Sequence, residues 1–318
     1  MNMEDTVRIG LIGVGIMGRN HLRILAMLKG VSLSFVYDQD IELAARLAAE
    51  NGAVTGPELE PLLSDVDAVV ICTPTVTHSS YMRRAAEHVR NIFVEKPLAH
   101  DLSETKSMVA FANERGLNVQ VGFIERFNPA VQQLKSVIDE ATQVISLDFM
   151  RTNKLSSRIT DVDVVTDLMI HDIDLALFLN GPVLDVSAHG LAEGGMINFA
   201  SALLTHANGR FSRIQASRIT EKKMRKIQAT CADMFVDCEL LRKELLISRQ
   251  SEIAPQDGGP YKISAIEETI EVRPQEALLS ELQAFAASCR TGSPHGPGPS
   301  DALLAADICD MIQRAVLK

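Results

Sequence analysis

"GLIGVGIMGRNH", residues 10–21, begins as an apolar run and then places glycines at positions 13, 15 and 18. When this spacing follows a strand and opens a helix, it is typical of a dinucleotide-binding loop. Gly13 permits the tight turn, Gly15 lets the backbone approach a pyrophosphate, and Gly18 lets helix and strand pack closely. The N–H groups at the start of the helix would hold the phosphates. The stretch therefore predicts a Rossmann-type βαβ start.

The choice of dinucleotide depends on Asp38, which lies at the end of the next expected strand. A carboxylate there accepts hydrogen bonds from the adenosine ribose hydroxyls and repels a 2′-phosphate, so the sequence favours NAD over NADP. Ile16 and Met17, inside the glycine loop, are expected to contact the same cofactor. The alternative is an ordinary cluster of turn glycines, and the flanking strand, helix and acidic residue argue against it.

The wider pattern predicts two domains, residues 1–122 and 123–318. The first alternates strands and helices, which indicates an α/β domain with a parallel sheet. Its expected strands are 7–12, 33–37, 68–72, 91–94 and 117–121, and its expected helices are 18–28, 41–51, 78–89 and 103–115. The second domain is predicted to be α+β with an antiparallel sheet, from β-rich runs at 144–152, 184–191, 199–206, 210–219, 226–231 and 263–273.

Three further features shape the second domain. Asn208 and Gly209 predict a tight hairpin turn in which both supply positive φ angles. An apolar helix over residues 165–180 ends at Gly181 and Pro182, and two helices are expected at the C-terminal end.

Composition narrows the class of partner. The formal net charge of −10 and the pI near 5.3 argue against nucleic acid or an anionic membrane. No apolar run approaches the ~18 residues of a membrane span, and the N-terminus does not read as a signal peptide. The five cysteines are scattered without a CxxC pair, which favours a reduced, cytoplasmic protein.

The carboxyl ends of the third and fourth expected strands carry "CTPTVTH" and "VEKPL". Ligands bind at such strand ends in open α/β sheets, so these segments are expected to contact the cofactor. The residues concerned are Thr73, Pro74, Thr75, His78, Glu95 and Lys96. For the first segment the alternative is that Pro74 ends the strand and a threonine caps the next helix, and His78 alone favours that alternative.

Lys96 is a candidate catalytic residue because an apolar strand leads directly into it and Pro97 restricts the backbone beyond it. A lysine in a cleft can have its pKa lowered by desolvation and can exchange a proton with a substrate hydroxyl. The alternative is a solvated Lys–Glu pair at the surface.

Asp167 and His171 stand four residues apart on the apolar helix, which places them on one face. His171 can accept a proton near neutral pH, and Asp167 can orient it. The alternatives are a hydrogen-bonded core histidine, or a metal site that uses His171 with Asp167 or Asp174. No second histidine or cysteine stands at ligand spacing there, so we expect no metal.

Polar residues near the domain junction are expected to bind substrate. Arginines offer bidentate donors to phosphate or carboxylate, and their alternative role is in domain-linking salt bridges. These residues are Glu125, Arg126, Asn128, Arg151 and Arg158.

Together, "GLIGVGIMGRNH", "CTPTVTH", "VEKPL", "GFIERFNP" and "DLMIHDIDL" resemble the Gfo/Idh/MocA oxidoreductase family along the whole chain. The resemblance implies an N-terminal Rossmann domain and a C-terminal domain with an open-faced, mostly antiparallel sheet. It also implies that Lys96, Asp167 and His171 form the catalytic group, and that a partner subunit covers the open face in a homodimer or homotetramer.

"VGFIERFNPAV" and "RITDVDVVTDLMIHDIDL" further resemble the branch of UDP-N-acetylglucosamine 3-dehydrogenases, although Asp163 stands where that branch is expected to have glycine. This resemblance implies oxidation of a nucleotide-sugar 3-hydroxyl by NAD, and a downstream aminotransferase as partner. The alternatives are an inositol or other sugar dehydrogenase of the same family, and a non-catalytic NAD-binding redox sensor.

Overall fold

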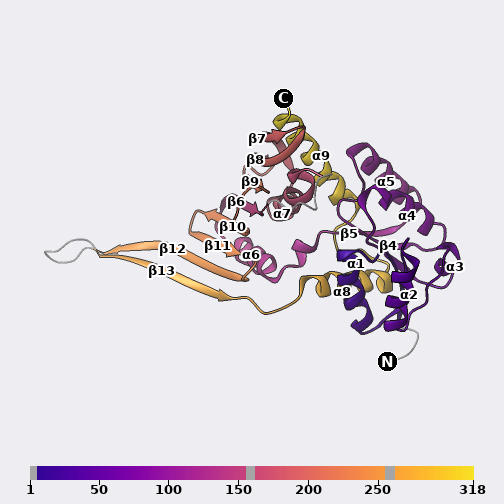
Figure 1. Ribbon diagram of the computed structural model, residues 1–318. Helices are drawn as coiled ribbons and strands as arrows, with labels where there is room; N and C mark the ends of the chain where they lie inside the picture. The colour runs from indigo at the N-terminus through magenta and orange to yellow at the C-terminus, as the bar shows by residue number, and fades with distance from the viewer. Residues whose placement is uncertain (1–5, 155–161, 255–261) are drawn as a thin grey trace. The chain divides into compact units, whose positions relative to one another are not determined.

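The computed structural model describes residues 6–154, 162–254 and 262–318 (Figure 1). The chain forms two compact units. The first contains residues 1–124 and 276–307, and the second contains residues 125–275 and 308–318. The first unit therefore takes in a segment from the C-terminal end that the expected domain limits assigned to the second domain.

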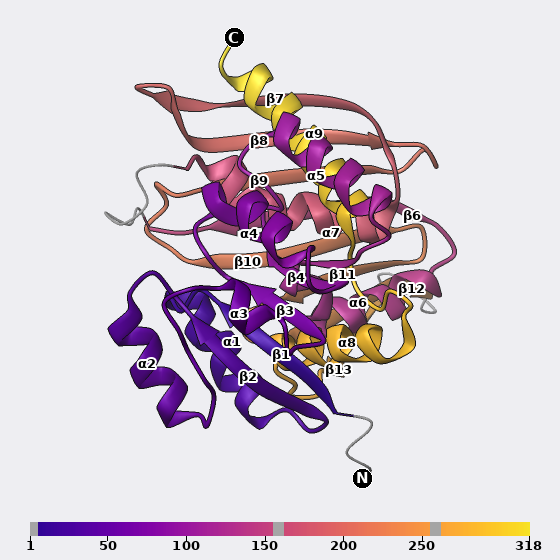
Figure 2. The same ribbon diagram turned by 90° about the vertical axis from the view of Figure 1, so that its right-hand side faces the viewer.

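The first unit is built on a parallel five-stranded sheet in the order β2-β1-β3-β4-β5, as predicted. The strands are β1 (Val7–Ile12), β2 (Val31–Tyr37), β3 (Ala68–Ile71), β4 (Asn91–Glu95) and β5 (Asn118–Gly122). The strand order reverses at β1, which lies between β2 and β3 (Figure 2). In open α/β sheets such a reversal opens a ligand crevice at the carboxyl ends of the strands.

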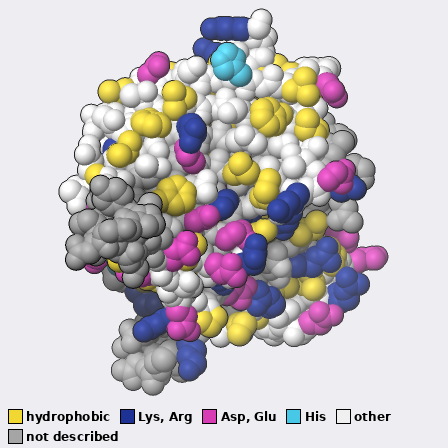
Figure 3. Space-filling view, turned by 90° about the vertical axis from the view of Figure 1, so that its left-hand side faces the viewer, with side chains coloured by type: hydrophobic (Ala, Val, Ile, Leu, Met, Phe, Trp, Pro, Cys, Tyr) yellow, Lys and Arg dark blue, Asp and Glu magenta, His cyan; other side chains and the backbone are white. Residues whose placement is uncertain are grey.

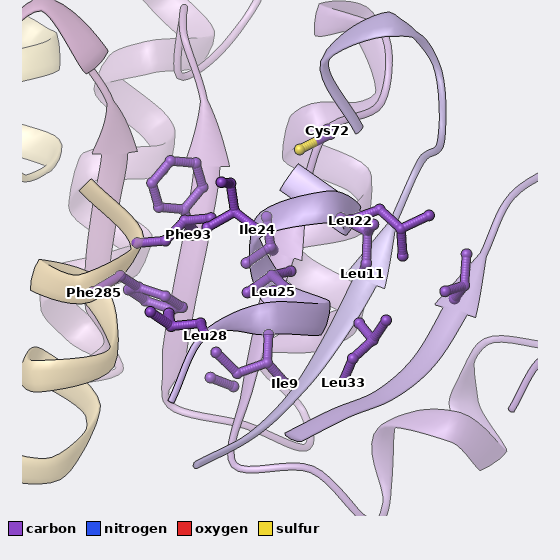
Figure 4. Packing of buried hydrophobic residues seen from close by; sticks show 14 of the residues in the cluster. Ile9, Leu11, Leu22, Ile24, Leu25, Leu28, Leu33, Cys72, Phe93 and Phe285 are labelled. Carbon is purple, nitrogen blue, oxygen red and sulfur yellow. The ribbon is translucent and has the colours of Figure 1, made fainter. Parts of the chain in front are cut away.

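Helices connect these strands. They are α1 (Ile16–Met27), α2 (Ile41–Glu50), α3 (Glu60–Leu63), the 3₁₀ turn η2 (Thr75–Thr77), α4 (His78–Ala85) and α5 (Leu102–Glu114). The core between sheet and helices contains Leu11, Ile24, Leu25 and Phe93 (Figure 4). Phe285 of α8 (Ala277–Thr291) is fully buried in the same core, so α8 is an integral part of the first unit.

The second unit is built on an eight-stranded sheet in the order β13-β12-β11-β10-β6-β9-β8-β7. Its strands are β6 (Val144–Thr152), β7 (Val183–Glu193), β8 (Met196–His206), β9 (Phe211–Ser217), β10 (Met224–Cys231), β11 (Met234–Glu239), β12 (Glu244–Ala254) and β13 (Lys262–Glu271). The pairs are antiparallel except β6 with β9, which is parallel. The sheet is therefore mostly antiparallel, as the family resemblance implies. A helix and two strands separate β6 from β9 in the chain, so no hairpin joins these two strands.

The helical elements of this unit are η3 (Ile124–Phe127), α6 (Pro129–Asp139), the π-helical turn η4 (Val165–Met169) and α7 (Ile170–Asn180); the chain ends with α9 (Pro299–Val316), which both units share. Both α6 and α7 pack on strands of the sheet. The predicted hairpin turn joins β8 to β9, but only Gly209 has a positive φ, of 81°. Asn208 instead uses its side-chain amide to donate to Asn180 O, at 2.8 Å.

Candidate active site

The three glycines of the loop after β1 meet three different surroundings. Gly13 has a φ of +93°, and a Cβ there would lie 2.8 Å from the backbone of Cys72 at the end of β3. A Cβ on Gly18 would lie 2.0 Å from Gly13 O. A Cβ on Gly15 would meet no protein atom within 4 Å. Packing therefore requires glycine at positions 13 and 18, whereas at position 15 it keeps the backbone open to a ligand.

The start of α1 is open in the same way. Gly15 is its N-cap residue and has no side chain to bond the first N–H groups. Ile16 and Met17, which follow it, are 69% and 37% exposed. Uncapped N–H groups at a helix start attract anions, so this loop has the chemistry that a dinucleotide pyrophosphate needs.

Asp38, just after β2, holds the glycine loop directly. Its Oδ2 accepts the Val14 N–H at 2.7 Å, and its Oδ1 accepts the Asp40 N–H at 3.0 Å. The carboxylate that was predicted to bind a ribose therefore lies against the loop predicted to bind the pyrophosphate.

The segment after β3 is fixed by its own side chains. Thr77 Oγ1 donates to Thr73 Oγ1 at 2.9 Å and contacts Pro74 O at 2.7 Å. His78 is 1% exposed and its ring lies between two carbonyl oxygens. Thr75 is the first residue of η2, and Pro74 is the N-cap residue of that turn. The burial of His78 favours its structural alternative.

Lys96 is half-buried at the carboxyl end of β4. The Glu95 side chain beside it is 12% exposed and lies 2.7 Å from the fully buried His21 Nε2. Burial would raise the pKa of Glu95, but the hydrogen bond with His21 and the charge of Lys96 outweigh it and lower that pKa. His21, Cys72 and Glu95 place possible ligand atoms within 4.8 Å of one another, the one such group in the described residues.

In the second unit, Asp167 and His171 lie at the junction of η4 and α7. The Ile170 N–H bonds Val165 O, the i to i+5 pattern of a π-helix, so the expected continuous α-helix begins with a π turn. Such turns are frequent at functional sites. Asp163 begins this segment, where its Oδ1 accepts the N–H groups of Val165 and Thr166, each at 2.9 Å. An aspartate there caps the turn, which glycine cannot do.

Arg218, just after β9, was missed from the sequence. Its side chain is 5% exposed, and Nη2 lies 3.6 Å from Asp167 Oδ2. That nitrogen makes no hydrogen bond in the part of the chain that the structure describes. A basic residue directly after an apolar strand was the available signal, and it did not distinguish Arg218 from other strand-end arginines.

The arginines predicted to bind substrate are paired inside the second unit. Arg151 is 3% exposed and donates to both oxygens of Asp172, at 2.8 and 2.7 Å, and to Glu125 Oε1 at 2.9 Å. Arg126 donates to Asp174 through Nε and Nη2, the latter at 2.7 Å. These contacts favour a structural role for both arginines, within one unit.

The remaining predicted substrate residues follow the same pattern. Asn128 caps α6 through Ala130 N and donates to Glu125 Oε2 at 3.0 Å. Burial would raise the pKa of Glu125, but Arg151 and Asn128 lower it. Burial raises the pKa of Asp172 in spite of its bond to Arg151. Arg158 lies outside the described residues.

The fold and the glycine loop together define an NAD-binding oxidoreductase, and comparison with known proteins agrees. Residues 7–123 match the family described as "Oxidoreductase family, NAD-binding Rossmann fold", and residues 147–233 match the "GFO/IDH/MocA C-terminal domain". The chain belongs to the Gfo/Idh/MocA oxidoreductase family.

Individual relatives are consistent with this assignment. The UDP-N-acetylglucosamine 3-dehydrogenase of Acidithiobacillus ferrooxidans is 33% identical over 88% of this chain and 87% of its own. A solved structure of that enzyme matches with a TM-score of 0.87, at 30% identity and 98% coverage of both chains. The inositol 2-dehydrogenase of Rhodococcus jostii is 29% identical over 97% of this chain and 90% of its own. A levoglucosan dehydrogenase complex with NADH, 21% identical with a TM-score of 0.84, shares the fold.

No helix in the described ranges is both long and apolar enough to span a membrane.

Proposed function

We propose that the protein oxidises the 3-hydroxyl of UDP-N-acetylglucosamine to a ketone, with NAD as the oxidant. The observation that carries the proposal is the similarity to a 3-dehydrogenase of this sugar over nearly the whole chain, in sequence and in fold. Of the residues proposed for catalysis, Lys96 directly follows β4, Asp167 lies in the π turn η4, and His171 is the second residue of α7, just after that turn. Strand ends and π turns are both frequent places for functional residues.

In this proposal His171 removes the hydroxyl proton, Asp167 orients the imidazole, and Lys96 donates a hydrogen bond to the alcohol oxygen as negative charge develops on it. When bound, NAD supplies the acceptor for the hydride from the same carbon, so the balanced products are the ketone, NADH and one proton. The uncapped start of α1 would hold the pyrophosphate, and Asp38 would bind the ribose.

Arg218 is the better candidate for the diphosphate of the substrate than Arg126 or Arg151. Each of those two already donates to a buried carboxylate in at least two hydrogen bonds. Arg218 has one longer contact, to Asp167, and a nitrogen that makes no hydrogen bond in the described chain. We expect Arg218→Lys to raise the KM for the nucleotide sugar more than the KM for NAD.

The test is NADH formation from NAD and UDP-N-acetylglucosamine, with glutamate and a sugar aminotransferase present to remove the ketone. Turnover that Lys96→Ala and His171→Ala each lower by about 100-fold or more would support the proposal. Turnover with inositol or free sugars in place of the nucleotide sugar would assign the protein to the other branch of the family, for which the inositol dehydrogenase match is the evidence.

A redox sensor is the candidate from another class. It predicts that NAD binds without turnover of any alcohol, and that Lys96→Ala and His171→Ala change nothing measurable. NAD binding by calorimetry, run beside the turnover assay, separates this outcome from a protein that is simply inactive.

We further propose a homo-oligomer formed through the sheet face opposite α6 and α7. That face exposes Leu191, Leu203 and Phe235 at 46%, 42% and 38%. Figure 3 shows apolar side chains spread over one face of the molecule, with acidic and basic groups among them. A hollow of about 290 Å³ lies on the sheet, lined in part by Asp148, Met150 and Gln215. Light scattering of the wild type and of Leu203→Glu tests the proposal. We expect the charged variant to dissociate, and a monomeric wild type would contradict the proposal.

A further inference from the structure

On the N-terminal side of Lys96, a buried side chain holds the backbone. Glu95 Oε2 accepts the Lys96 N–H at 3.2 Å, and Glu95 Oε1 accepts a hydrogen bond from His21 Nε2 at 2.7 Å. His21 is 0% exposed and packs edge-on against Phe93, with ring centroids 5.2 Å apart. In the described residues, α1 is therefore joined to the Glu95 carboxylate by one hydrogen bond, and that bond is buried.

The position of Glu95 is constrained from β5 as well. A Cβ on Gly122 would lie 2.9 Å from Glu95 Oε2 and 3.2 Å from Glu95 Cα. The carboxylate is thus confined between β5 and His21. Because burying an ionised carboxylate is costly unless it is bonded, a histidine at this position does more than fill space.

The other side of Lys96 is held in the same manner. Pro97 O lies 2.8 Å from His78 Nδ1, and Thr73 O lies 2.9 Å from His78 Nε2. This ring joins the segment after β3 to the segment after β4. Both neighbours of Lys96 in the chain therefore contact buried histidines, one from α1 and one from α4.

We propose that His21 is a positioning residue for Lys96: by holding the Glu95 carboxylate it fixes the backbone from which the lysine side chain extends. His21 belongs to the helix that the glycine loop opens, so the helix placed to bind the pyrophosphate also sets the position of the lysine. The inference rests on the catalytic role proposed for Lys96, and it adds a residue outside that catalytic group.

The first test needs no substrate. The Lys96 amine is labelled by reductive methylation, and its rate is measured by mass spectrometry in the wild type, His21→Leu and His21→Gln. We expect His21→Leu to speed labelling at least about threefold, because release of Glu95 frees the half-buried lysine. His21→Gln should restore the wild-type rate, since the Gln amide can reach a hydrogen-bond position close to that of His Nε2.

His206→Leu is the matched control. His206 is 1% exposed and contacts Gly181 O and Ser212 Oγ in the second unit. The His206→Leu substitution removes a buried, hydrogen-bonded histidine that has no contact with the segment around Lys96 in the described residues. An equal rise in Lys96 labelling in this variant would overturn the inference, because it would show that loosening of the fold alone is sufficient.

The second test is a double-mutant cycle on kcat. His21→Leu is expected to lower kcat about 10-fold or more in the wild type, and by less than about twofold in the Lys96→Ala background. Equal losses in both backgrounds, or unchanged labelling, would contradict the inference and leave the proposed function intact. If the nucleotide sugar is not the substrate, the labelling result still decides the role of His21.

Discussion

Gly15 and Gly18 are both glycine, but for different physical reasons. At position 18 a Cβ would overlap Gly13 O, whereas at position 15 it would meet no protein atom. The fold therefore requires glycine at position 18, whereas no contact in the described chain requires it at position 15. The structure thereby separates two roles that a glycine motif in a sequence presents together.

This difference makes a prediction. Gly18→Ala is expected to lower the free energy of unfolding by about 1–3 kcal/mol, because the backbone must shift to admit the methyl group. Gly15→Ala should change stability by less than about 1 kcal/mol, since a Cβ there meets no protein atom and the only cost is alanine in place of glycine at the N-cap. It should nevertheless weaken NAD binding about 10-fold or more.

Urea denaturation and calorimetric titration with NAD measure the two effects separately. Val14→Ala, next to Gly15 but inside the core, is a suitable control, because it should lose stability with little direct effect on the cofactor. Unchanged NAD affinity in Gly15→Ala would show that the loop does not approach the pyrophosphate.

Among the elements, α7 combines an apolar sequence with buried carboxylates. Asp172 and Asp174 are 2% and 0% exposed, and each is bonded by an arginine from outside the helix. Of the charged groups on this segment, these two therefore act in the fold, while Asp167 and His171 remain the candidates for chemistry.

The buried pair of α7 should matter more to stability than an exposed one. Asp172→Asn is expected to cost about 3–5 kcal/mol, because it leaves Arg151 buried and only partly compensated. Asp148→Asn removes a bidentate partner from Arg213, whose side chain is 65% exposed, and should cost less than about 1 kcal/mol. Urea denaturation of both variants makes the comparison, and equal losses would contradict the assignment of Asp172 to the core network.

Element prediction succeeded or failed for local reasons. The strand β1 was predicted with its exact ends, since an apolar run and a glycine mark them. Helix α6 was missed although Asn128 and Pro129 are a good cap and first residue. Strand β11 was missed although its buried and outward residues alternate without a break, because two of the outward residues, Asp237 and Glu239, are acidic and acidic residues are depleted in strands.

For the whole molecule, the return of the chain to its first unit is the main feature. Phe285 of α8 is fully buried against Phe93, with ring centroids 5.7 Å apart. The apolar face of α8 is visible in the sequence, but its partner is not, because an amphipathic helix packs on any suitable apolar surface.

Phe285→Ala is therefore expected to destabilise the NAD-binding unit by about 3–5 kcal/mol, although it lies far from the glycine loop in sequence. Leu304→Ala on α9, at a residue that is 48% exposed, should change stability by less than about 0.5 kcal/mol. Denaturation followed through loss of NAD binding measures the effect on this unit. A wild-type midpoint for Phe285→Ala would mean that α8 does not support it.

The sequence by itself determined the local features of this protein: the glycine loop, the acidic residue after β2, the alternating elements of the first unit, and the family they resemble. Each depends on residues close together in the chain, where spacing and side-chain type constrain geometry. Only the tertiary structure decided that Arg151 binds Asp172, that His21 holds Glu95, and that α8 completes the first core. Those contacts join residues 21, 74 and well over 100 positions apart, and a charge or an apolar face in the sequence does not specify which distant partner it meets.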